Sequence, residues 1–136
     1  MKIILSGTAS DSHTWNLVYL GLFLEERGHD VVALGPCVSP RLLTAACRRH
    51  APDAVVLSSV NGHGHRDALA AVRALRAEPE SAALPVAVGG KLGTAGRSGE
   101  AEAALLREAG CDAVLGDGAA DLEALCAFLA AHRVVA

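Results

Sequence analysis

Aromatic residues and long apolar runs are both scarce in this chain of 136 residues. It has one Trp, one Tyr and two Phe, although 51% of its residues are hydrophobic. We therefore expect an aliphatic core of Val, Leu, Ile and Ala. No run approaches the roughly 18 apolar residues of a transmembrane helix. The first apolar run, residues 3–5, is also shorter than the about 7 to 15 residues of a signal peptide. We interpret it as part of a strand and expect a cytoplasmic protein.

An excess of basic charge is absent as well. The net charge is −3 and the isoelectric point is near 6.0, which argues against binding to nucleic acid or to an anionic membrane. The cysteines match no zinc-binding or redox spacing; they are Cys37, Cys47, Cys111 and Cys126. Cys47 and Cys126 lie in apolar helical segments, where we expect them to pack as small hydrophobic side chains. The length predicts a single domain over residues 1–136.

Short β-rich segments alternate with longer segments rich in Ala and Leu. Strands are predicted at residues 2–6, 30–35, 53–59 and 84–90, and a fifth strand with its exit at 112–118; their continuous apolar runs indicate burial on both faces. Helices are predicted from residue 15 or 16 to 27, and at 40–50, 66–76, 100–109 and 121–132. Ser39 and Pro40 are typical of an N-cap and a first helical residue, and Gly28 is typical of the position just after a helix's last turn. The alternation predicts an α/β fold, a doubly wound (flavodoxin-like or Rossmann-like) five-stranded parallel sheet with helices on both faces.

Polar and small residues gather after four of the five predicted strands. These exits read GTASDSHTWN, SSVNGHGH, GGKLGTAG and GDG. In a doubly wound sheet, ligands bind beyond the carboxyl ends of the strands, near the point where the strand order reverses. Glycine also lets a ligand approach the backbone closely. We therefore expect the binding site at this edge of the sheet.

Several common ligands of this fold class do not match these exits. The first exit lacks the G-x-G-x-x-G pattern of dinucleotide-binding domains, and no P-loop is present. The receiver domain of a response regulator would need an acceptor Asp at the end of the third strand, where Ser58 and Ser59 stand. A flavodoxin would need a phosphate loop rich in Ser and Thr, and aromatic side chains around its flavin.

Asp11, His13 and Asn16 form a pattern that resembles the D-x-H-x-x-G motif of cobalamin-binding domains, with Asn16 in the position of the final glycine. Residues 58–60 (SSV) and 89–90 (GG) resemble the two downstream motifs of that family, at about the same distances. The resemblance covers nearly the whole chain. It is closest to the small cobalamin-binding subunits of glutamate (methylaspartate) mutases.

The resemblance implies that His13 is the axial cobalt ligand, in place of the cofactor's own dimethylbenzimidazole. Asp11 would accept a hydrogen bond from the other ring nitrogen, which fixes the tautomer and raises the basicity of the ligating nitrogen. The displaced nucleotide tail would enter a slot between the sheet and a helix, where Ser58 would bond its base. The cofactor-binding residues implied are Asp11, Ser12, His13, Thr14, Asn16, Ser58, Ser59, Val60, Gly62, Gly89, Gly90 and Gly118.

Asn16 is the departure from the family pattern. Asn is a common substitute where glycine adopts a positive φ, whereas its side chain would crowd a corrin that approaches closely. Trp15 either lies beneath the corrin or belongs to the core. His63 and His65 form an H-x-H pair in a segment that we interpret as a polar loop rather than a metal site.

The resemblance implies the cobalamin-carrying small subunit of an adenosylcobalamin-dependent carbon-skeleton mutase. In such an enzyme the cofactor does the difficult chemistry and the protein positions it. The chain is too short to enclose a substrate as well, so we expect a larger, barrel-type partner subunit that binds the substrate. One alternative is a corrinoid methyl carrier for a methyltransferase, although such carriers usually have a helical cap before the first strand. The other is a non-catalytic cobalamin sensor or a flavodoxin-like binding module.

Overall fold

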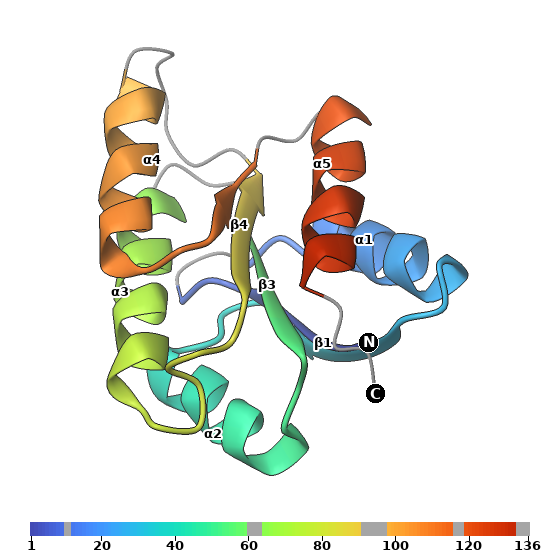
Figure 1. Cartoon of the computed structure of the whole chain (residues 1–136), viewed down its shortest axis with the longest axis horizontal. Helices are drawn as coiled ribbons and strands as arrows, with labels where there is room; N and C mark the ends of the chain where they lie inside the picture. Colours follow the sequence, from blue (N-terminus) through green and yellow to red (C-terminus); the bar gives the residue numbers. More distant parts are fainter. Residues whose placement is uncertain (10–11, 60–63, 91–97, 116–118, 133–136) are drawn as a thin grey trace.

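The computed structural model describes residues 1–9, 12–59, 64–90, 98–115 and 119–132, over which strands and helices alternate (Figure 1). The strands are β1 (Lys2–Gly7), β2 (Asp30–Gly35), β3 (Ala54–Ser59), β4 (Val86–Gly90) and β5 (Ala113–Val114). The helices are α1 (Trp15–Glu26), α2 (Pro40–His50), α3 (Gly64–Ala77), α4 (Ser98–Ala109) and α5 (Ala119–Ala131). Most ends lie within two residues of the predicted ones. Within these ranges no helix is long and apolar enough to cross a membrane.

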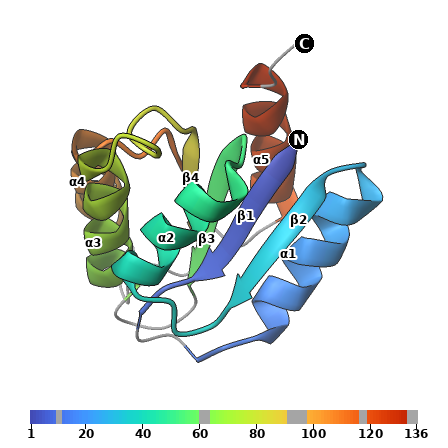
Figure 2. The same ribbon diagram turned by 90° about the horizontal axis from the view of Figure 1, so that it is seen from below.

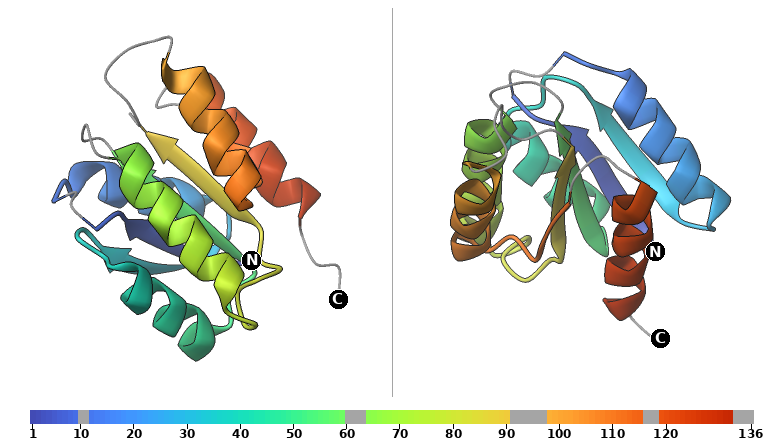
Figure 3. Two further views of the ribbon diagram at one scale, coloured as in Figure 1. Left: turned by 90° about the vertical axis from the view of Figure 1, so that its left-hand side faces the viewer. Right: turned by 90° about the horizontal axis from the view of Figure 1, so that it is seen from above.

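The strands form one parallel sheet in the order β2-β1-β3-β4-β5, which confirms the doubly wound prediction. Helices α1 and α5 cover one face, and α2, α3 and α4 cover the other (Figure 2). On the second face α3 and α4 lie side by side (Figure 3). The central strands β1 and β3 are therefore buried on both sides, as their continuous apolar runs predicted.

Two apolar clusters fill the space between the sheet and its helices. Because side chains alternate along a strand, Ile4 and Val55 pack with α2, α3 and α4, whereas Ile3 and Val56 pack with α1 and α5. The core is aliphatic apart from Phe128 among its buried members. Cys47 is also buried, as predicted, and burial raises the pKa of its thiol to about 11. That thiol therefore stays protonated near neutral pH and packs as a small apolar group.

The ends of α1 and α2 follow local signals in the sequence. Ser39 caps α2 by accepting a hydrogen bond from the backbone N–H of Leu42 over 3.3 Å, and Pro40 is the first helical residue. Gly28, just beyond α1, has a φ of +85°, a conformation that glycine adopts without steric cost. Both ends were predicted from the sequence.

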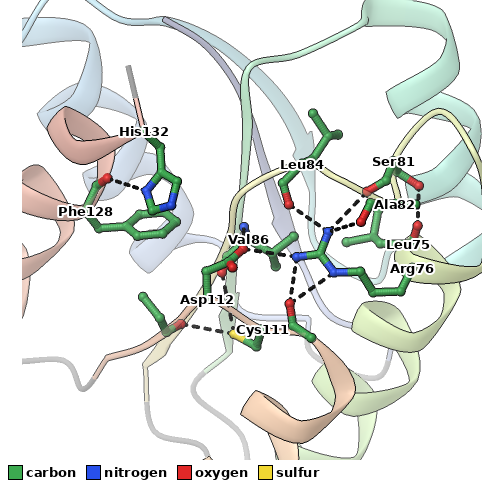
Figure 4. A network of polar contacts seen from close by, with 12 residues as sticks. Leu75, Arg76, Ser81, Ala82, Leu84, Val86, Cys111, Asp112, Phe128 and His132 are labelled. Carbon is green, nitrogen blue, oxygen red and sulfur yellow. Dashed lines mark hydrogen bonds and ion pairs between the residues drawn. The ribbon is translucent and has the colours of Figure 1, made fainter. Parts of the chain in front are cut away.

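Arg76, at the end of α3, ties together the segments that lead into β4 and β5 (Figure 4). Its Nη1 donates to the carbonyl oxygens of Ser81, Ala82 and Leu84, at 3.2, 3.0 and 2.7 Å. Its Nε and Nη2 donate to the carbonyl of Gly110, at 3.0 and 2.6 Å. Nη2 also lies 3.0 Å from a carboxylate oxygen of Asp112. This single guanidinium therefore links the segments at the amino-terminal ends of β4 and β5.

Gly110 lies against this guanidinium in a conformation that suits glycine. Its φ is +115°, and a Cβ added there would lie 2.8 Å from Nε and 2.9 Å from Cγ of Arg76. Gly28 also has a positive φ, but a Cβ there would meet nothing within 4 Å. We expect Gly28→Ala to lower the free energy of unfolding by about 1 kcal/mol through backbone strain alone. Gly110→Ala should lower it by about 3 kcal/mol, because it also displaces Arg76. Urea denaturation measures both losses of stability. Equal losses would contradict the close contact between position 110 and Arg76.

Candidate functional site

The predicted motifs meet at the carboxyl edge of the sheet, by which we mean the ends of β1, β3 and β4. Gly7 of β1 is in register with Ser58 of β3, and Ser58 is in register with Gly89 of β4. Ser59 pairs in the same way with Gly90. The residues of the second and third motifs that the structure describes therefore lie on adjacent strands, at the edge where we expected the binding site.

The alternation of the strands separates these residues between the two faces. Ser58 follows Val56, and Gly89 follows Ala87, at a spacing of two, so both belong to the face covered by α1 and α5. Gly7 is in register with them, but there is no room for a side chain at this position, since an added Cβ would lie 3.1 Å from Cα of Pro36. Ser59 is fully buried, and the same alternation turns it toward the opposite face. Ser58 and Gly89, without Ser59, are thus the pair that faces α1.

Asn16 joins the first motif to the second. Its Nδ2 donates a hydrogen bond to Oγ of Ser58 over 2.8 Å, across 42 positions of the sequence. Ser58 is 4% exposed, so this contact is largely shielded from water. A hydroxyl that accepts one hydrogen bond still has its own proton to donate. Ser58 therefore keeps a donor for a ligand, while Asn16 holds the start of α1 against β3.

Two buried oxygens at this edge of the sheet lack a hydrogen-bond partner among the described residues. One is Oδ1 of Asn16, and the other is Oγ1 of Thr8, which directly follows β1 and is 1% exposed. Buried polar atoms are nearly always paired, so unpaired ones at the ligand-binding edge of this fold indicate a missing partner. Thr8 was not among the residues that the sequence singled out. In the sequence, the only indication of a role for Thr8 was that it is a polar residue next to a buried strand.

His13 lies between β1 and α1 and is exposed, as are its neighbours Ser12 and Thr14. Trp15, the first residue of α1, is 84% exposed. Of the two interpretations of Trp15, membership of the core is therefore wrong. The imidazole and the indole both lie at the surface, where a large planar ligand can reach them.

Several predicted site residues fall outside the part of the chain that the structure describes. They are Asp11, Val60, Gly62 and Gly118, together with His63 of the H-x-H pair. The pairing of Asp11 with His13 therefore stays a prediction. The polar groups that the structure does bring together are Asn16 and Ser58, beside the backbone of Gly7 and Gly89.

Solved structures show how widespread this fold is. A cobalamin-binding protein from Desulfitobacterium hafniense matches 93% of this chain with a TM-score of 0.73 and 23% identity, and the chain spans 58% of that protein. A LuxR-family response regulator from Aurantimonas matches 96% of the chain, with 84% of its own length covered, a TM-score of 0.70 and 22% identity. Cobalamin-binding and receiver domains thus share the fold, and these likenesses alone do not separate them.

Sequence comparison does separate them. The glutamate mutase sigma subunit 1 of Haloarcula marismortui is 31% identical over 114 residues, which are 82% of this chain and 73% of that subunit. The family model of the B12 binding domain matches residues 1–126, nearly the whole chain. The chain therefore belongs to the B12-binding domain family.

Proposed function

We propose that this chain is the cobalamin-carrying small subunit of an adenosylcobalamin-dependent carbon-skeleton mutase. Membership of the B12-binding domain family and the 31% identity to a glutamate mutase sigma subunit support this assignment. The structural observation that carries it is the hydrogen bond from Asn16 to Ser58. It anchors the segment that bears His13 to the second motif, at the edge where this fold binds ligands.

The residues at the carboxyl edge fit the cofactor. His13 is exposed and follows β1, and its imidazole would be the cobalt ligand. A neutral imidazole is a suitable cobalt ligand, and Asp11 would hold its tautomer through the other nitrogen. Ser58 and Gly89 face α1, where a small hydroxyl and a missing side chain suit a flat nucleotide base.

When bound, adenosylcobalamin supplies a cobalt–carbon bond whose homolysis starts a radical rearrangement. The chain's own residues would hold and orient the cofactor. The described part of the chain leaves His13 and Trp15 at the surface, so exclusion of water from the reacting face requires another protein. We assign this role to a larger, barrel-type subunit that binds the substrate.

An exposed apolar stripe on α1 supports a partner at this edge. Its members are Trp15, Val18, Tyr19 and Leu22, each at least half exposed. Their spacing of three or four residues places them on one face of the helix, and the stripe begins two residues after His13. Contiguous exposed apolar surface marks interaction sites more often than isolated apolar residues do. The stripe is therefore continuous with the surface that the second subunit would cover.

The isolated chain should bind cobalamin but should not interconvert glutamate and methylaspartate. Addition of the epsilon subunit of the Haloarcula marismortui enzyme, with adenosylcobalamin, should restore turnover. Product formation with and without that subunit measures both parts of the prediction. Turnover by the chain alone would contradict the two-subunit assignment. Activity only in transferring the methyl group of bound methylcobalamin to an acceptor would instead favour the methyl-carrier alternative.

The apolar stripe offers a matched control for the partner in the same assay. Leu22→Glu places a charge in the stripe, whereas Leu42→Glu places one at a similarly exposed leucine on α2, at 57% and 61% exposure respectively. Leu22→Glu should raise the concentration of large subunit needed for half-maximal turnover about tenfold, with cobalamin binding unchanged. Leu42→Glu should behave as the wild type. Equal effects of the two variants would show that the stripe is not part of the interface.

A further inference from the structure

We propose that Asn16 selects the base at the end of the corrinoid's nucleotide tail, and that it favours an aminopurine over dimethylbenzimidazole. The inference rests on the proposed function, because it concerns the slot that the tail would occupy. It goes beyond that function by naming the chemical class of corrinoid that this chain prefers. The observation behind it is the half-buried amide of Asn16, whose nitrogen has a partner and whose buried oxygen has none among the described residues.

The amide is held at the start of α1, against the sheet. Its Nδ2 is bonded to Ser58, whereas its Oδ1 is enclosed and has no partner among the described residues. Ser58 lies on the face covered by α1 and α5 and is in register with Gly89, which has no side chain. A base that enters between the sheet and α1 therefore meets the amide of Asn16 as well as the hydroxyl of Ser58.

The two bases differ in what they offer to such an amide. The outer edge of dimethylbenzimidazole carries two methyl groups and no hydrogen-bonding group. The edge of adenine carries an amino donor beside a ring-nitrogen acceptor, and Asn pairs with both when proteins recognise adenine. A buried polar group that a ligand leaves unpaired weakens binding, and sites built around such groups discriminate strongly against ligands that lack the complement.

Glycine, which occupies this position in the motif that the chain resembles, would contribute no polar group. The slot would then hold the hydroxyl of Ser58 alone, which can donate its proton to a ring nitrogen of either base. Asparagine adds a second polar group, the amide, whose oxygen needs a hydrogen-bond donor. Only a base with a polar edge supplies that donor. The departure from the motif at position 16 is thus the feature that sets base preference.

The test uses three corrinoids and three proteins. The corrinoids are cobalamin, its analogue with adenine as the base, and cobinamide, which has no nucleotide tail. The proteins are the wild type, Asn16→Gly and Asn16→Ala, with folding checked by circular dichroism. Dissociation constants come from quenching of Trp15, the only tryptophan of the chain, and the visible spectrum reports replacement of the lower ligand. Cobinamide measures the contribution of the corrin alone.

We expect the wild type to bind the adenine analogue at least tenfold more tightly than cobalamin, and both variants to bind the two within about twofold of each other. Cobinamide should bind all three proteins equally. Equal affinity of the wild type for the two bases, with histidine ligation visible for both, would overturn the inference and leave the proposed function standing. A preference that persists in both variants would also overturn it. Absence of binding to every corrinoid would overturn the proposed function and this inference together.

Discussion

Replacement of His13 by alanine should abolish the spectral signature of histidine-ligated cobalamin and weaken binding at least tenfold. The expected size follows from outer partners of metal-bound histidines, whose loss alone commonly costs about 10- to 100-fold in affinity or activity. Removal of the ligating imidazole should cost no less. In the wild type, titration with cobalamin should shift the visible spectrum as dimethylbenzimidazole leaves cobalt. In His13→Ala, the spectrum should remain that of free cobalamin or of a form without an axial base.

His132→Ala is the matched control, because His132 is also exposed but lies at the end of α5, where its ring contacts the carbonyl of Phe128. This variant should bind cobalamin as the wild type does. Free imidazole added to His13→Ala should restore a nitrogen ligand and with it part of the spectral shift. If His13→Ala shifted the cobalamin spectrum as the wild type does, His13 would be eliminated as the ligand, and with it the main element of the site.

Replacement of Arg76 by alanine should lower the free energy of unfolding by about 3 kcal/mol. The variant leaves the carbonyls of Leu84 and Gly110 without their donor and Asp112 without its cation. Each lost hydrogen bond contributes about 1 kcal/mol, and unpaired groups that stay shielded from water add to the loss. For a chain of this size the melting temperature should fall by roughly 10 °C. Thermal and urea denaturation measure the two quantities.

Arg73→Ala is the control on the same helix. Arg73 lies one turn before Arg76 and is exposed, so its replacement should cost less than about 0.5 kcal/mol. Arg76→Lys should fall between the two, because a single ammonium has three donors at one point and cannot bond all the partners of Arg76 on the two segments at once. Losses of the same size in Arg76→Ala and Arg73→Ala would show that the network contributes little to stability.

Most of the fold could be predicted because its signals are local. Continuous apolar runs identified the buried strands, and Ser39, Pro40 and Gly28 identified helix ends. The last strand and its exit were predicted together at residues 112–118, and β5 comprises Ala113–Val114 within the described residues. β5 pairs only with β4, and β2, the other edge strand, pairs only with β1. Side-chain pattern alone does not reveal how many neighbours a strand has.

The site was predicted in outline but not in its contacts. The motifs placed His13, Ser58 and Gly89 at one edge, and strand register brings Ser58 and Gly89 together. The hydrogen bond from Asn16 to Ser58 was missed, because it depends on how α1 packs on β3. The exposure of Trp15 was not decided either, since α1 carries apolar residues on both of its sides and its pattern does not indicate which side faces the core.

The fastening at Arg76 and the contact at Asn16 lie at opposite ends of the strands and share no residue. The five residues of β4 alone separate the two ends by roughly 15 Å. Substitutions that far apart, without common partners, add their free energies to within about 0.5 kcal/mol. A substitution at position 16 that alters the preferred corrinoid therefore needs no compensating substitution near Arg76. Such a fold can change its ligand preference through single substitutions.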